Sequence, residues 1–236
     1  MHKQVFLSLF VCSFLFLVVS YFPGSVPDPL LIVFFILILG IALKFLGKES
    51  AIVFGAFSAI YFVFMGVENI STLYLHMSFL SFSLYFLWDK RAQLIQGCGS
   101  IQKRIGYGIM IFALMIFASV LANAAIRAAG IDDQEKVLDT ISSLPLYLLI
   151  MAFTLGPISE ELFFRAFLVP RVGVPVSTIL FTITHVAYGS TAELVGVFFL
   201  GFILANAYFF LRDPLPCIIA HALFNLFSVM LILWVF

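Results

Sequence analysis

Charged residues are scarce in this sequence, and Asp, Glu, Lys and Arg together make up 10% of its 236 residues. The basic and acidic residues are equal in number, so the sequence has no net charge and no polybasic surface for nucleic acid. In contrast, 64% of the residues are hydrophobic and the mean hydropathy is +1.19. This composition excludes an ordinary soluble domain and predicts an integral membrane protein.

Cysteine is also rare, with copies at Cys12, Cys98 and Cys217 alone. They are isolated and form no C-x-x-C pair, so the sequence predicts neither a disulfide framework nor a thiolate zinc site. The H-E-x-x-H zinc motif is missing as well. At the N-terminus, an apolar run continues through Val19 without a small-residue cleavage site. We therefore expect a retained first membrane span rather than a signal peptide.

Nine segments are long or apolar enough to be considered as spans, since a bilayer core about 30 Å thick needs about 20 apolar residues in a helix. They cover roughly residues 5–22, 30–46, 51–67, 71–88, 105–128, 144–168, 175–188, 191–211 and 214–235. The seventh segment is short and is either re-entrant or fused to a neighbour. The sequence therefore predicts an all-α polytopic transmembrane helical bundle with eight to nine spans.

The loops between these segments alternate between basic and acidic. The strongest basic loop runs from Asp89 to Arg104, and an acidic stretch runs from Asp132 to Asp139. Because basic loops stay in the cytoplasm, we expect a cytoplasmic N-terminus. The expected location is a prokaryotic cell membrane. We divide the chain into N-terminal transmembrane helices with the basic cytoplasmic loop, 1–104, and a catalytic transmembrane core, 105–236.

A few polar side chains interrupt the apolar segments of the second half. Ionisable groups at membrane depth are costly and functional by default. Pro157, just before the first of them, predicts a kink that opens a water pocket. The polar residues are Glu160, Glu161, Arg165, His185, His221 and Asn225.

These residues come from three helices and reach a similar depth. Glu160 and His185 each lie ten residues from the proline at the expected cytoplasmic end of their helix, which is about 15 Å at 1.5 Å per residue. His221 and Asn225 follow Pro214 by seven and eleven residues, or about 10 and 16 Å. A shared layer favours a common site over scattered packing residues.

Spacing along each helix separates the two acids. Glu161 and Arg165 are four residues apart on one face, which predicts an ion pair. Glu160 is rotated about 100° away and lacks that partner. His221 and Asn225 also share a face. The sequence thus predicts Glu160 as a general base and the Glu161–Arg165 pair as its support.

The three motifs resemble those of the CPBP family, which comprises CAAX prenyl endopeptidases with bacteriocin-processing and self-immunity relatives. The family pattern is E-E-x-x-x-R, then F-x-x-x-H, then H-x-x-x-N. In this sequence it is met by Glu160 to Arg165, Phe181 to His185 and His221 to Asn225. Each motif is weak alone, but their order on apolar helices is specific. The resemblance covers about Leu144 to Phe236.

The resemblance implies a glutamate-dependent intramembrane endopeptidase. Glu160 and His185 would activate a water for attack on a peptide carbonyl. His221 and Asn225 would stabilise the oxyanion, and Glu161 with Arg165 would support the site. The expected partners are the lipid bilayer and a membrane-anchored protein or peptide, processed at a CAAX-type C-terminus, a leader or a sorting signal. No nucleic acid and no cofactor are expected.

Two other functions remain open from the sequence. The two His and two Glu are plausible zinc ligands, so a metal-dependent hydrolase of the same fold is one alternative. A non-catalytic membrane protein, such as an immunity factor or scaffold, is the other. Activity that survives exhaustive chelation would rule out the metal-dependent hydrolase. Complementation in cells by a Glu160 variant would favour the non-catalytic protein.

Overall fold

The computed structural model describes residues 2–20, 40, 52, 55, 56, 70–131 and 133–235. These residues form helices and no strands, which confirms the all-α class. The chain divides into two compact units, Met1–Trp88 and Asp89–Phe236. The predicted boundary at 104/105 separates parts by function and stays a prediction.

In unit 1, helices α1 (His2–Ser20) and α4 (Ile70–Leu87) pack against each other. Aromatic rings join them: Phe10 and Phe82 have centroids 5.0 Å apart, and Phe16 and Tyr74 have centroids 5.7 Å apart. The predicted segments 30–46 and 51–67 fall almost entirely outside the described residues.

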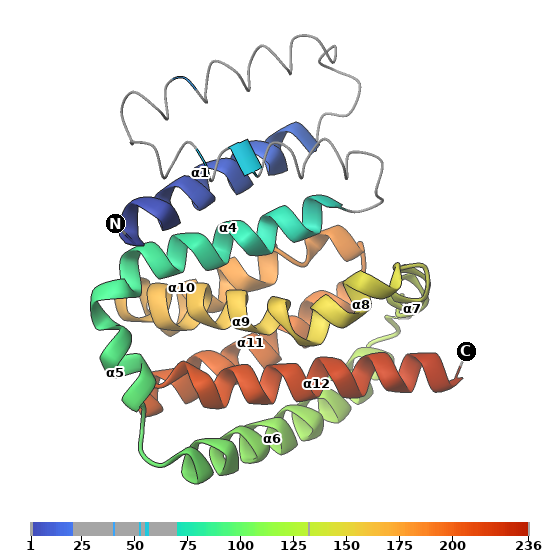
Figure 1. Cartoon of the computed structure of the whole chain (residues 1–236). Helices are drawn as coiled ribbons and strands as arrows, with labels where there is room; N and C mark the ends of the chain where they lie inside the picture. Colours follow the sequence, from blue (N-terminus) through green and yellow to red (C-terminus); the bar gives the residue numbers. More distant parts are fainter. Residues whose placement is uncertain are drawn as a thin grey trace. The chain divides into compact units, whose positions relative to one another are not determined.

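Unit 2 contains the remaining helices, and α12 packs along α6, α8 and α9 (Figure 1). A short 3₁₀ turn, η1 (Trp88–Lys90), crosses the boundary between the units. The elements of unit 2 are α5 (Arg91–Gln96), α6 (Ile101–Ala128), α7 (Glu135–Ser142), α8 (Leu146–Phe153), α9 (Leu155–Glu160), η2 (Glu161–Leu168), α10 (Val169–Ile183), η3 (Val186–Tyr188), α11 (Thr191–Leu211) and α12 (Pro214–Val235).

A small residue brings α6 and α12 together. A Cβ atom on Gly108 of α6 would lie 2.7 Å from Ile219 Cγ2 of α12, a separation that real side chains do not reach. Glycine therefore sets the close spacing of these two helices. At the start of α6, the Ser100 hydroxyl accepts a hydrogen bond from the backbone N–H of Lys103, which caps the helix.

The helix that carries the two acids is irregular. Thr154 has non-helical backbone angles (φ −120°, ψ −89°) and separates α8 from α9. Pro157 follows within one turn and has no N–H to donate, which fits the predicted kink. Beyond α9, η2 is a π-helix, a rare form that is frequent at functional sites.

The chain reverses direction at Gly173 inside α10. Gly173 has φ 81° and ψ 170°, which interrupts the helix and favours glycine. Beyond it, the Ser177 hydroxyl donates a hydrogen bond of 2.6 Å to the Phe164 carbonyl, thirteen residues earlier. A straight helix would separate these residues by about 20 Å. The last part of α10 therefore folds back on η2.

A buried ion pair joins the starts of α6 and α12. Arg104 donates to Asp213 from Nε (2.6 Å) and Nη2 (2.8 Å). Burial of Asp213 opposes ionisation, but the Arg104 guanidinium and the N–H groups of Cys98 and Leu215 outweigh it and lower the pKa of this carboxyl. The starts of α6 and α12 thus lie at one end of unit 2.

At the opposite end, Asp133 caps the first turn of α11. Its carboxylate accepts hydrogen bonds from the N–H of Thr191 (2.6 Å), the N–H of Ala192 (3.0 Å) and the hydroxyl of Ser190 (2.9 Å). These N–H groups, Thr191 first, lower the pKa of Asp133 to about 2. Arg104 and Asp133 therefore mark the two ends of the unit.

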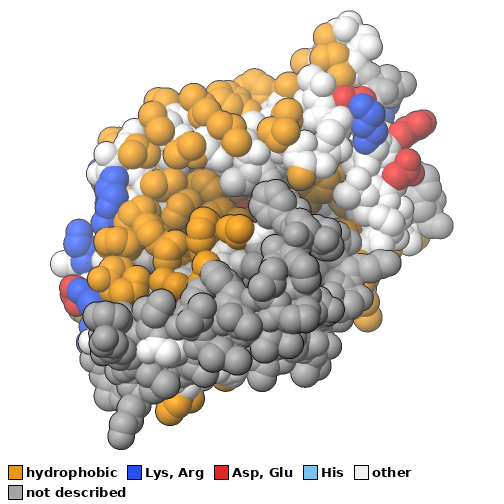
Figure 2. Space-filling model, turned by 90° about the horizontal axis from the view of Figure 1, so that it is seen from above, with side chains coloured by type: hydrophobic (Ala, Val, Ile, Leu, Met, Phe, Trp, Pro, Cys, Tyr) orange, Lys and Arg blue, Asp and Glu red, His pale blue; other side chains and the backbone are white. Residues whose placement is uncertain are grey.

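Among the described residues, five helices are long and apolar enough to cross a membrane, or six if the bent pair α7–α8 counts as one span. The predicted total of eight to nine spans is not confirmed. On the face seen in Figure 2, hydrophobic side chains form broad patches and charged side chains gather at the edges. These helices indicate an integral membrane protein. The five helices that are long and apolar enough to cross a membrane are Ile70–Leu94, Ile101–Ala128, Leu155–Tyr188, Thr191–Leu211 and Pro214–Trp234.

Candidate active site

The predicted ion pair between Glu161 and Arg165 is present at the start of η2. Arg165 Nε lies 3.2 Å from Glu161 Oε2, and the two side chains are 1% and 0% exposed. Arg165 also donates from Nη2 to the Gly201 carbonyl of α11 at 3.3 Å. Because a buried charge needs a partner, each residue fixes the other in this apolar interior.

His221 of α12 is the second partner of Glu161. Its Nδ1 lies 2.9 Å from Glu161 Oε1, and with the carboxylate as acceptor the Nδ1–H donates. This hydrogen bond fixes the ring so that Nε2 faces away from Glu161. The sequence predicted the Arg165 pair but not that Glu161 also orients His221.

Glu160 lies on the other side of the His221 ring. Its Oε2 is 3.8 Å from His221 Nε2, beyond direct hydrogen-bond distance, and its side chain is 13% exposed. Basic and acidic side chains thus alternate along one chain of contacts across η2, α9 and α12, in the order Arg165, Glu161, His221 and Glu160. The partly open end of this chain is Glu160.

His185 follows α10, and its orientation is set locally. Its Nδ1 lies 3.0 Å from the Phe181 carbonyl and 3.2 Å from Thr184 Oγ1. With Nδ1–H donating to the carbonyl, Nε2 is left as the available acceptor. His185 therefore presents one ring nitrogen for chemistry.

Phe181 brings the two histidines into one site. Its ring centroid lies 4.8 Å from that of His185 and 6.0 Å from that of His221. The Arg165 guanidinium lies 4.1 Å above the same ring, as a cation–π contact. A Cβ on Gly201 would come within 2.8 Å of Phe181 Cδ1, so glycine is needed for this approach.

Asn225 lies one turn beyond His221 and caps the broken helix. Its Nδ2 donates a 2.7 Å hydrogen bond to the Ala152 carbonyl at the end of α8. The break at Thr154 disturbs the helical hydrogen bonds of this carbonyl, which explains the need for another donor. The predicted oxyanion role of Asn225 would depend on its second amide N–H.

Tyr188 and Gly189, near the site, were missed by the sequence analysis. Tyr188, in η3, stacks on His185 with centroids 6.1 Å apart and rings inclined by 16°. Gly189 has a left-handed backbone (φ 65°), which allows the tight turn after Tyr188. The Tyr-Gly pair after His185 was the available signal.

Metal binding was an alternative for this site. In the described part of the chain, no three His, Cys, Asp or Glu side chains are grouped as ligands for one metal ion. The arrangement joins a partly open carboxylate to an oriented imidazole in an apolar interior. Such a pair can move a proton and stabilise developing charge.

Comparison with known proteins gives a family match over part of the chain. Residues 142–227 match the family model described as Rce1-like, type II CAAX prenyl endopeptidase. Neither the curated proteins nor the solved structures contain a match. The matched segment includes all six predicted site residues, from Glu160 to Asn225. Residues 142–227 therefore carry the Rce1-like pattern of a protease family, in agreement with the predicted CPBP resemblance.

Proposed function

We propose that this protein is an intramembrane endopeptidase in which Glu160 activates a water molecule. The observation that carries the proposal is the buried chain Arg165–Glu161–His221–Glu160, which ends in the more exposed carboxylate. A purely structural ion pair would need neither the two histidines nor a second acid. The Rce1-like match supports a peptidase of the CAAX type.

Glu160 is the base in the proposed reaction. It accepts a proton from water while the water oxygen bonds to the scissile carbonyl carbon. The carbonyl becomes an oxyanion, and collapse of this intermediate breaks the C–N bond. The proton held by Glu160 then passes to the leaving amine nitrogen. His185, with Nε2 available, helps to hold the water.

The oxyanion needs preorganised donors in a dry site. His221 can donate from Nε2 when it is protonated, and Glu161 stabilises that cation through Nδ1. Asn225 has a second amide N–H besides the one bound to Ala152. Glu161 and Arg165 support the site and do not touch the substrate. No cofactor takes part in the proposed reaction.

The proposed substrate is a membrane-anchored protein or peptide, cleaved near a CAAX-type C-terminus, a leader or a sorting signal. The proposed location is a prokaryotic cell membrane with the N-terminus in the cytoplasm. A site buried among apolar helices fits a substrate that reaches it from the bilayer rather than from bulk water.

The test compares cells that produce the wild-type protein with cells that produce Glu160→Gln. Mass spectrometry of the termini of membrane proteins should show new ends that depend on Glu160. Glu135→Gln, an exposed acid of α7 changed in the same way, is the matched control and should leave the pattern intact. Identical termini in the wild type and Glu160→Gln would contradict the proposal and favour a non-catalytic role.

A further inference from the structure

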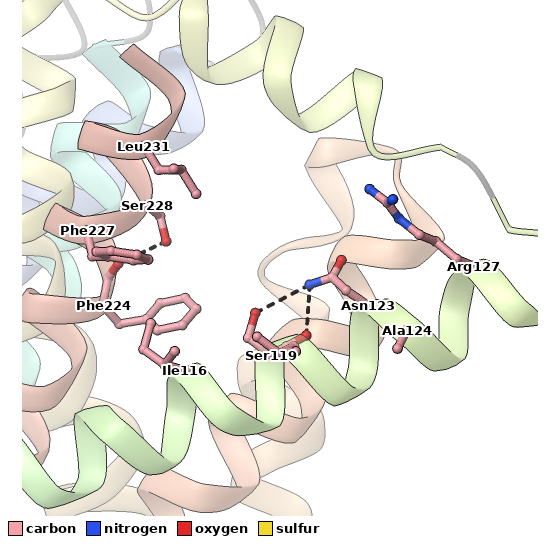
Figure 3. Close-up of a pocket in the computed structure, with 10 residues that line it drawn as sticks. Ile116, Ser119, Asn123, Ala124, Arg127, Phe224, Phe227, Ser228 and Leu231 are labelled. Carbon is pink, nitrogen blue, oxygen red and sulfur yellow. Dashed lines mark hydrogen bonds between the residues drawn. The ribbon is translucent and has the colours of Figure 1, made fainter. Parts of the chain in front are cut away.

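An elongated groove lies between α6 and α12, apart from the candidate active site. Its volume is about 460 Å³, and no predicted site residue lines it. Ile116 and Ala124 of α6 form one wall, and Phe224, Phe227 and Leu231 of α12 form the other (Figure 3). Val120 of α6 also lines the groove. These walls are apolar, and most of their side chains are partly or fully exposed.

The groove becomes polar toward the end of α6. Ser119, Asn123 and Arg127 lie along this side, with Arg127 in the last turn of α6. Asn123 Nδ2 donates to the Ser119 carbonyl at 2.8 Å, and Gln134 Nε2 donates to Asn123 Oδ1. The polar residues Ser119, Asn123 and Arg127 thus follow one another at four-residue intervals on α6, and the last of them carries a positive charge.

Arg127 has spare hydrogen-bonding capacity. Its Nη2 donates to Gln134 Oε1 at 3.4 Å, a long bond to a neutral partner. No carboxylate of the described residues forms an ion pair with it. A guanidinium has five N–H donors and binds phosphate well, so Arg127 can accept an anionic group from outside the chain.

The dimensions fit one leaflet of a bilayer. Ile116 and Arg127 are eleven residues apart, about 16 Å along the helix and close to half of a hydrocarbon core of about 30 Å. An apolar groove in such a core has no favourable contents other than hydrocarbon, since both water and a void lack attractive contacts there. Its occupant must therefore be apolar along its length and anionic at one end.

We propose that this groove binds an anionic glycerophospholipid, with its phosphate on Arg127 and an acyl chain along the apolar walls. Arg127 lies at the end of unit 2 marked by Asp133, where a headgroup meets water. The site does not depend on peptidase activity, because it shares no residue with the chain of Arg165, Glu161, His221 and Glu160.

The test uses the full-length protein in phosphatidylcholine nanodiscs that contain a phosphatidylglycerol with a photoreactive acyl chain. Crosslinked peptides should come from 116–127 and 224–231. Unlabelled phosphatidylglycerol should compete, and diacylglycerol with the same chains should compete poorly. Arg127→Gln should reduce crosslinking about fivefold, the contribution of one cation to binding an anionic lipid.

Two variants make the result decisive. Lys103→Gln removes an exposed cation at the other end of α6 and should leave crosslinking in the groove unchanged. Ala124→Phe fills the groove and should abolish crosslinking there while the protein keeps its helix content and elution volume. Equal crosslinking in the wild type and Arg127→Gln, or equal competition by diacylglycerol, would overturn the proposal.

Discussion

Unit 2 buries two arginine–carboxylate pairs, and they use their remaining hydrogen-bonding groups differently. Asp213 accepts four hydrogen bonds, two from Arg104 and one each from the N–H groups of Cys98 and Leu215. A carboxylate has about four such positions, so Asp213 is saturated. This pair ties a loop to the starts of two helices.

The pair at the candidate site is less complete. Glu161 divides its two oxygens between Arg165 and His221, and the contact with Arg165 lacks the alignment of a hydrogen bond. Arg165 Nη1 is buried without a hydrogen-bond partner in the described part of the chain. Saturation of Asp213 fits a structural pair, whereas coupling of Glu161 to further ionisable groups fits the reactive role that we propose for the site.

Replacement of Glu161 should give the largest effect within this comparison. Glu161→Gln removes the negative charge that orients His221 and balances Arg165. We expect a loss of about 10²-fold in kcat and about 3–5 kcal/mol in the free energy of unfolding. Cleavage assays and chemical denaturation of the reconstituted protein measure the two effects. Loss of stability with unchanged kcat would show that Glu161, like Asp213, has a structural role only.

Asp213→Asn should affect stability alone. It leaves Arg104 buried without its counter-charge, which should lower the free energy of unfolding by about 3 kcal/mol. The rate per folded molecule should equal that of the wild type, because the candidate site keeps all its contacts. Equilibrium unfolding and a cleavage assay normalised to folded protein provide the measurement. A large loss of kcat would show that the two pairs are coupled.

Asn225→Ala should lower kcat by about 10²-fold if the second amide N–H binds the oxyanion. The lost hydrogen bond to Ala152 should cost about 1 kcal/mol of stability. Asn206→Ala is the matched control, since Asn206 donates to a carbonyl one turn earlier in its own helix. Stability loss without a change in kcat would restrict Asn225 to capping α8.

Asp133 should have the smallest effect, confined to the first turn of α11. Its pKa is lowered to about 2 by the N–H groups of Thr191 and Ala192, below about 3.9 in an unfolded chain. The stability that it contributes is therefore present above about pH 4 and is lost as the pH falls to about 2.

Hydrogen exchange tests this cap. At about pH 6 the amides of Thr191 and Ala192 should exchange faster in Asp133→Asn than in the wild type, and the difference should shrink toward about pH 2. Asp139→Asn, an exposed acid of α7, should behave like the wild type. A difference that stays constant with pH would rule out the carboxylate cap.

The sequence predicted a contact between two oppositely charged side chains of one helix. The spacing of Glu161 and Arg165 predicts their pair, because residues four apart share a face. Contacts between helices depend on rotation and on backbone breaks. The hydrogen bond from His221 to Glu161 was therefore not predicted. The hydrogen bond from Asn225 to the Ala152 carbonyl, near the backbone break at Thr154, was not predicted either.

Other features had no periodic signal at all. Asp213 is a single loop residue between two apolar helices, and its partner Arg104 is 109 positions away. Gly173 reverses the chain inside a segment whose apolar pattern reads as continuous. Depth estimates from proline positions predict one layer for Glu160, His185 and His221, but they carry no information about which side chains touch.

The role of Glu160 as the base is tested by the cleavage rate of purified Glu160→Gln, measured together with its unfolding midpoint in phosphatidylcholine nanodiscs. Glu160 is more exposed than Glu161 and is the base in the proposed reaction. We predict a wild-type midpoint together with a loss of about 10⁴-fold in kcat. A wild-type midpoint together with a wild-type rate would show that Glu160 is not the base.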